Sequence, residues 1–185
     1  MLNWANRLTI LRIVAVPVFI ASLLYYTPDK AYFYYLGVVV FLLACLTDGL
    51  DGYIAVKFHQ KTVLGSYIDP IADKLLLMSG FLSLSFMKNL PVFMKIPAWL
   101  TILVIARDVI ILIGSTMIFL TTGQLKAAPL YIGKITTVSQ MAALFFTLIA
   151  TPEPFKLSLF VISGCLTVIS GVLYIRMGGR LLQAS

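Results

Sequence analysis

The stretch from Leu46 to Lys74, LTDGLDGYIAVKFHQKTVLGSYIDPIADK, places four aspartates in sequence that is otherwise strongly apolar. Asp48 and Asp51 stand three residues apart near the end of one apolar run, and Asp69 and Asp73 stand four apart at the start of the next. These spacings put each pair on one face of a helix. Carboxylates inside a membrane segment are costly and usually functional. Four of them together repel one another unless cations bind them or some hold protons.

The composition around this stretch is typical of a membrane protein. The chain has 185 residues, of which 61% are hydrophobic and 11% charged, and its mean hydropathy is +1.01. These values lie outside the range of soluble domains and predict a single integral membrane domain over residues 1–185. The net charge of +7 comes from basic residues scattered singly. It therefore favours an anionic membrane surface and phosphate-bearing substrates over nucleic acid.

Six apolar stretches are long enough to cross a bilayer as helices, which predicts an all-α fold with six transmembrane helices. Their expected bounds are Leu8–Tyr26, Ala31–Val56, Ile68–Met87, Ala98–Thr121, Gly133–Ala150 and Phe155–Met177. An even number of spans puts both termini on one side, and the positive charges flanking the spans favour the cytoplasm. Residues 1–7, MLNWANR, are expected to form a short interfacial segment before the first span.

In this orientation the second span runs toward the cytoplasm and the third runs back, joined by a loop from about Lys57 to Tyr67. Both aspartate pairs then lie near the cytoplasmic ends of antiparallel neighbours, where they can face each other at one depth. Ligand sets made only of oxygen favour Mg²⁺ or Mn²⁺ over zinc or copper. The sequence therefore predicts a membrane-embedded site for divalent metal.

The run from Asp48 to Asp73 resembles the signature of the CDP-alcohol phosphatidyltransferase family, DxxDGxxAR followed by eight residues and GxxxDxxxD. The residues at matching positions are Asp48, Asp51, Gly52, Ala55, Gly65, Asp69 and Asp73. Other segments are similar to the branch of the family whose acceptor is glycerol 3-phosphate. They are the amino-terminal pattern of Asn6, Thr9, Arg12 and Pro17, the segment DPIADK, the ARD around Arg107 and the GK at Lys134.

This resemblance implies a six-span CDP-alcohol phosphotransferase fold and a homodimer in a bacterial inner membrane, with the active site facing the cytoplasm. The implied reaction moves a phosphatidyl group from CDP-diacylglycerol to an alcohol with the help of two Mg²⁺ or Mn²⁺ ions. Asp48, Asp51 and Asp69 are the implied metal ligands, and Asp73 is implied both to bind metal and to act as base. The implied CDP-binding residues are Asn6, Thr9, Asp48, Gly52, Ala55, Lys57, Gly65 and Asp69. Arg107 and Lys134 are expected to bind the phosphate of the acceptor.

The chain departs from the family pattern at two places. Val56 occupies the position of the signature arginine, and Lys57 lies about 100° further round the helix. A lysine there cannot reproduce a bidentate guanidinium, which puts the affinity for the nucleotide diphosphate in doubt. The stretch IILIGSTMIFL, residues 110–120, also lacks the second arginine common in the fourth helix of the glycerol 3-phosphate branch.

These departures leave alternatives open. Phosphatidylglycerol, as in CMP-forming cardiolipin synthases, is the second candidate acceptor, followed by inositol phosphate, serine or another polar alcohol. Intramembrane aspartates also occur in cation transporters, but that class gives no reason for Gly52, Ala55 and Gly65 in this register. A catalytically inactive lipid-binding scaffold draws its support from Val56 alone. For Arg107 and Asp108, the alternative to a phosphate pocket is a purely structural ion pair inside the membrane.

Overall fold

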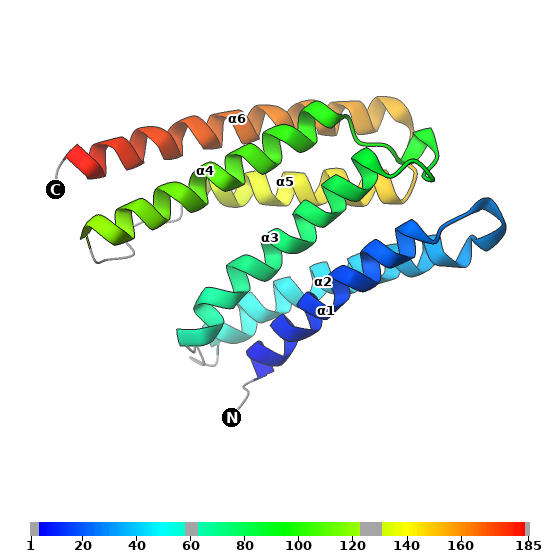
Figure 1. Cartoon of the computed structure of the whole chain (residues 1–185), viewed down its shortest axis with the longest axis horizontal. Helices are drawn as coiled ribbons and strands as arrows, with labels where there is room; N and C mark the ends of the chain where they lie inside the picture. Colours follow the sequence, from blue (N-terminus) through cyan, green and yellow to red (C-terminus); the bar gives the residue numbers. More distant parts are fainter. Residues whose placement is uncertain (1–3, 58–62, 123–130, 184–185) are drawn as a thin grey trace. The chain divides into compact units, whose positions relative to one another are not determined.

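The computed structural model describes residues 4–57, 63–122 and 131–183, with side chains described for 10–47, 74–117, 120 and 131–179. Six α-helices and two short 3₁₀ turns make up the described chain (Figure 1). The helices are α1 (Trp4–Leu24), α2 (Tyr32–Lys57), α3 (Val63–Phe86), α4 (Ala98–Thr122), α5 (Tyr131–Leu148) and α6 (Glu153–Gln183). The prediction of an all-α fold is confirmed within these ranges, and the prediction that all six helices cross a membrane stays a proposal.

The observed helix bounds agree closely with the predicted bounds at some helix ends and differ at others. Helices α2 and α4 agree with the prediction to within one residue at each end. Helix α3 begins at Val63 instead of Ile68, so part of the segment predicted as a loop is helical. Helix α6 continues past Met177 to Gln183, so the pair Gly178–Gly179 does not end it although glycine has a low helix propensity.

The end of α5 has a local cause. Ala150 adopts a left-handed backbone conformation with φ of 54°, and its N–H donates to the carbonyl of Thr147 at 3.1 Å. A left-handed residue just after the last turn is the common way to end a helix, although glycine is the usual occupant. Pro152, two residues on, cannot continue the hydrogen-bond ladder. The helix therefore ends at Leu148, two residues before the predicted limit.

The chain divides into two compact units. Unit 1 comprises Met1–Ile96 with Leu144–Ala150, and unit 2 comprises Pro97–Ala143 with Thr151–Ser185. Helices α1, α2 and α3 belong to unit 1 and helices α4 and α6 to unit 2 (Figure 1). Helix α5 contributes residues 131–143 to unit 2 and its last turn to unit 1.

Unit 1 is built on the antiparallel pair α1 and α2, with α3 packed against α1. The rings of Phe19 and Phe41 lie 5.8 Å apart at its centre. Gly37 allows a close approach, because a Cβ there would stand 2.8 Å from the Oγ of Ser22. Asn89, beyond the end of α3, donates its side-chain N–H groups to the carbonyls of Leu23, Leu24 and Tyr26. This amide satisfies carbonyls at the end of α1 that have no partner within the helix.

Unit 2 is held together by small and polar side chains. Helices α4 and α6 pack closely because Gly164 faces the Trp99 ring, with 2.8 Å from an added Cβ to the nearest ring carbon. Hydroxyl and amide groups join α5 to α6: Ser139 to Ser163 at 2.7 Å and Gln140 to Thr167 at 3.0 Å. Interfaces of small residues with hydrogen bonds between helices are typical of packing in membranes, where apolar burial gives little driving force.

Some of the described helices have the length and the apolar surface that crossing a bilayer requires. Two stretches within the described residues, Val92–Met117 and Glu153–Gly179, are long and apolar enough to cross a membrane. Shorter apolar helical stretches are Ile10–Leu24, Tyr32–Thr47 and Lys74–Phe86. Large aliphatic side chains such as Ile102 and Leu112 on α4, and Val161 on α6, are half exposed or more. An apolar surface this extensive is unusual for a soluble protein and suits contact with lipid.

Candidate active site

The four motif aspartates lie on consecutive helices of unit 1. Asp48 and Asp51 belong to α2, and Asp69 and Asp73 belong to α3. Asp51 precedes the end of α2 by six residues and Asp69 follows the start of α3 by six. At about 1.5 Å of rise per residue, both pairs stand at a similar distance from the segment that joins the helices. These bounds agree with two pairs at one depth.

The side chains of these aspartates lie outside the described part of the chain, so their metal ligation stays a prediction. The same holds for the side chains of the other CDP-binding candidates and of Val56. These candidates are Asn6 and Thr9 on α1, Gly52, Ala55 and Lys57 on α2, and Gly65 on α3. Among the side chains that are described, no group of three or more His, Cys, Asp or Glu could hold a metal ion.

The second candidate centre, at Arg107 on α4, lies within unit 2. Arg107 is only 5% exposed. Its Nε and Nη2 donate to the Oγ of Ser170 on α6 at 3.2 and 2.8 Å. Its Nη1 forms an ion pair with Asp108 Oδ1 at 2.8 Å, and its guanidinium carbon lies 5.6 Å from the centre of the Tyr174 ring. A buried cation needs such partners, since burial removes its hydration.

These contacts leave hydrogen-bonding capacity on the guanidinium. An arginine carries five N–H groups, one on Nε and two on each Nη. Within the described residues, the bonds to Ser170 and Asp108 use three of them. One N–H on Nη1 and one on Nη2 remain. A guanidinium that keeps N–H groups on both Nη atoms can donate to the oxygens of a phosphate. The ion pair with Asp108 is therefore compatible with anion binding as well as with a structural role.

The structure brings the first turn of α5 to this guanidinium. A Cβ added to Gly133 would stand 3.1 Å from Arg107 Nη2 and 3.3 Å from the Tyr174 hydroxyl. Lys134 follows directly and is exposed. The ARD segment of α4 and the GK segment of α5, which are separate in the sequence, thus meet at Arg107 and Gly133.

Ser170 and Tyr174 were not singled out by the sequence, and Gly133 entered only as the first residue of the GK segment. Ser170 and Tyr174 stand four residues apart on one face of α6, which is the only signal linking them. In an apolar helix, a serine and a tyrosine are ordinary packing residues. Their role beside Arg107 depends on how α6 packs against α4, which periodicity does not encode.

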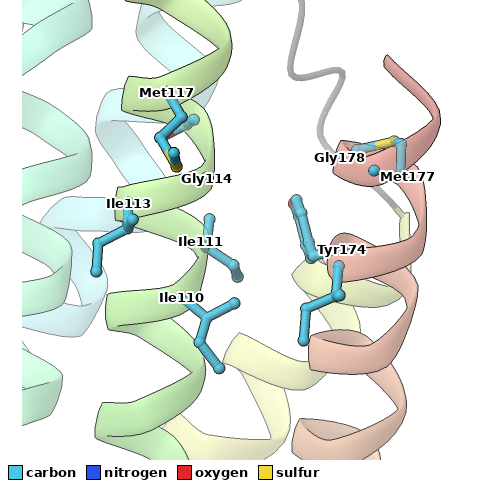
Figure 2. A pocket seen from close by; sticks show the side chains of 11 residues that line it. Ile110, Ile111, Ile113, Gly114, Met117, Tyr174, Met177 and Gly178 are labelled. Atoms are coloured by element: carbon cyan, nitrogen blue, oxygen red, sulfur yellow. The ribbon is translucent and has the colours of Figure 1, made fainter. Parts of the chain in front are cut away.

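A cavity of about 280 Å³ opens between α4 and α6, and the side chain of Tyr174 projects into the space between the two helices (Figure 2). Its walls are mainly apolar. The lining residues labelled in the figure are Ile110, Ile111, Ile113, Gly114, Met117, Tyr174, Met177 and Gly178. Such walls suit hydrocarbon and would leave a phosphate without partners.

Comparison with known proteins defines the class. The family model for CDP-alcohol phosphatidyltransferase matches residues 2–174. The chain belongs to this family, and the assignment made from the motif is confirmed. It is accordingly a transferase.

Three relatives with names are similar to this chain over most of its length. The chain is 33% identical over 177 residues to a Mycobacterium tuberculosis protein named "Probable phosphatidylglycerophosphate synthase", covering 94% of this chain and 80% of the relative. It is 31% identical to the CDP-diacylglycerol–glycerol-3-phosphate 3-phosphatidyltransferase of Bacillus subtilis, covering 86% and 83%. It is 33% identical to the Rickettsia typhi protein of the same name, covering 95% and 97%.

Proposed function

We propose that this protein transfers the phosphatidyl group of CDP-diacylglycerol to glycerol 3-phosphate, forming phosphatidylglycerophosphate and releasing CMP. The observation that carries the proposal is the set of four signature aspartates in a family member whose named relatives use this acceptor. The second arginine absent from residues 110–120 was the reason to consider phosphatidylglycerol. Relatives that cover most of the chain and carry the glycerol-3-phosphate name outweigh it.

The aspartates supply the chemistry of transfer. Asp48, Asp51, Asp69 and Asp73 form an oxygen-only donor set that fits Mg²⁺ or Mn²⁺. Two such ions, when bound, neutralise charge that develops on the phosphate oxygens. Asp73 accepts the proton of the acceptor hydroxyl, whose oxygen forms the new bond to the β-phosphorus of CDP-diacylglycerol. The bond from that phosphorus to the bridging oxygen breaks, and CMP leaves with the electron pair.

The acceptor phosphate belongs at Arg107. Its two remaining N–H groups give a bidentate contact, and Gly133 lets the start of α5 approach Nη2 closely. Lys134, the next residue, is exposed and carries an ammonium on a flexible stem. A dianionic phosphate loses its hydration on binding and needs both cations in return. The ion pair with Asp108 keeps the guanidinium in place when no acceptor is bound.

The proposed setting is a bilayer crossed by all six helices. Two described stretches have the length and hydropathy for crossing, and the apolar exposed faces of α4 and α6 support the same view. Basic residues near the predicted cytoplasmic ends favour termini and active site in the cytoplasm. A bacterial inner membrane and a homodimer complete the proposal by resemblance to the family, and an interfacial segment at residues 1–7 is proposed from the sequence MLNWANR.

The decisive experiment offers acceptors one at a time. Purified protein receives CDP-diacylglycerol and Mg²⁺ or Mn²⁺ with glycerol 3-phosphate, phosphatidylglycerol, inositol phosphate or serine, and CMP is measured together with the lipid product. We expect phosphatidylglycerophosphate. If cardiolipin is the only product, the acceptor is phosphatidylglycerol and our assignment of glycerol 3-phosphate is wrong. Cation flux through vesicles without CMP release would assign the chain to transport.

Two substitutions test the phosphate pocket. Arg107→Ala and Lys134→Ala should each raise the KM for glycerol 3-phosphate about tenfold or more, since each removes a charged hydrogen bond. The KM for CDP-diacylglycerol should change little. Lys88→Ala, at another exposed lysine, is the matched control and should change neither constant. Normal glycerol 3-phosphate binding in both alanine variants would leave the enzyme assignment intact and remove the pocket.

A further inference from the structure

We propose that Ser170 is a positioning residue, which orients the Arg107 guanidinium so that its two remaining N–H groups face the phosphate of the acceptor. The proposal rests on the proposed function, because it concerns the same phosphate. It assigns a role to α6, a helix in which the sequence showed no candidate site residue. Ser170 itself does not touch the phosphate in this scheme and acts through Arg107.

The geometry of the contact specifies an orientation. Ser170 Oγ accepts from Nε at 3.2 Å and from Nη2 at 2.8 Å, so it engages the side of the guanidinium that these two nitrogens share. One acceptor bound by two nitrogens of a rigid plane restricts rotation of that plane. The bond from Nη1 to Asp108 Oδ1 at 2.8 Å fixes it at a second point. The guanidinium is thus held at two corners by groups on two helices.

The neighbours of Ser170 reinforce this orientation. Ser170 is fully buried, so water does not replace it as the acceptor. Tyr174, one turn further along α6, lies against the guanidinium, whose carbon is 5.6 Å from the ring centre. Gly171 lies beside the stem of the arginine, where an added Cβ would make an ordinary 3.7 Å contact with Arg107 Cγ. One face of α6 therefore forms the cradle for the arginine.

Preorganisation explains why this cradle affects the reaction. A phosphate that meets an already oriented fork binds without first paying for ordering a long side chain. Without Ser170, Nε and Nη2 lose a buried acceptor, and the guanidinium can turn toward other oxygens. The acceptor should then bind more weakly, while the aspartates on α2 and α3 still process CDP-diacylglycerol.

The test compares Ser170→Ala with Ser163→Ala. Both serines are fully buried on α6, but Ser163 bonds to Ser139 on α5 and not to Arg107. Ser170→Ala should raise the KM for glycerol 3-phosphate about tenfold, the scale of a lost hydrogen bond to a charged group, with little change in kcat or in the KM for CDP-diacylglycerol. Ser163→Ala should lower thermal stability and leave the KM for glycerol 3-phosphate unchanged. Equal rises in both variants would overturn the proposal in favour of general packing.

A double-mutant cycle separates positioning from direct contact. Lysine lacks the guanidinium fork, so in an Arg107→Lys background the further change Ser170→Ala should alter the KM less than about twofold. A tenfold effect in that background would show that Ser170 acts without Arg107 and would overturn the proposal. Should Ser170→Ala fail to fold, Ser170→Cys keeps the size and supplies only a weak acceptor. It should give a raised KM, and a wild-type KM would reject the role.

Failure of this proposal and failure of the proposed function give different results. If the wild type makes phosphatidylglycerophosphate and Ser170→Ala binds glycerol 3-phosphate normally, the function stands and the positioning role is wrong. If the wild type releases no CMP with glycerol 3-phosphate, the acceptor assignment is wrong, and the positioning role for its phosphate is wrong with it.

Discussion

Arg107 and Gly133 are in such close contact that a Cβ on the glycine would stand 3.1 Å from Nη2 of the arginine. The arginine cannot simply withdraw, because Ser170 and Asp108 hold its other nitrogens. The glycine at the start of α5 thereby shapes the proposed phosphate site without contributing a side chain. The absence of a side chain is the property that the site requires at this position.

Gly133→Ala should displace the guanidinium and raise the KM for glycerol 3-phosphate, by about fivefold or more, since small misplacements of a binding group are costly. The fold should persist, because alanine favours a helix over glycine by about 1 kcal/mol. Gly114→Ala is the matched control: a Cβ there meets nothing within 4 Å. Steady-state kinetics with each substrate varied in turn measure the effect. An unchanged KM in Gly133→Ala would mean that Arg107 shifts without losing the phosphate.

We expect the reaction to depend on divalent metal, because the four carboxylates would otherwise repel one another. Chelator should abolish CMP release, and Mg²⁺ or Mn²⁺ should restore it. Asp48→Asn, Asp51→Asn and Asp69→Asn should each lower kcat by at least about a hundredfold, because each removes a charged ligand from a site that stabilises the transition state. Asp29→Asn, at an exposed aspartate between α1 and α2, should keep full activity. Undiminished turnover in chelator would refute the metal site.

The missing signature arginine can be restored. Val56→Arg should lower the KM for CDP-diacylglycerol, because a charged hydrogen bond to the diphosphate contributes about 1–3 kcal/mol. Val56→Met is the control, since it adds length without charge and should leave the KM unchanged. A folded Val56→Arg variant with the KM of the wild type would indicate that Lys57 or another group already fills this role, or that the arginine cannot reach the phosphate.

Packing between α4 and α6 gives a prediction about stability. In Gly164→Ala the new Cβ would stand 2.8 Å from a carbon of the Trp99 ring, which is rigid and cannot bend away. We expect a loss of about 1–3 kcal/mol in the free energy of unfolding, as in other overpacked interfaces. Thermal unfolding in detergent measures it. Gly179→Ala on the same helix meets nothing within 4 Å and should be neutral or stabilising. Equal stability of the two variants would contradict the close approach at Trp99.

The helices and the family could be predicted from the sequence because both depend on local spacing. Apolar runs bounded by prolines and glycines gave six helices, two of them to within a residue at each end. The spacing of Asp48, Asp51, Asp69 and Asp73 indicated a metal site and a family, and the family is confirmed. The ends of the helices were harder to predict. The left-handed backbone at Ala150 and the continuation of α6 through Gly178 depend on local contacts.

The surroundings of Arg107 were decided by tertiary structure alone. The sequence showed a charged pair in an apolar helix and left a structural and a functional interpretation open. Ser170 lies 63 positions away in the sequence, and its bond to Arg107 exists only because α4 and α6 pack side by side. Periodicity tells which face of a helix is apolar, but the partner that a polar group meets depends on which helices pack together and in what register. Local spacing therefore determined the helices and the motif, and helix packing determined the cradle that orients the arginine.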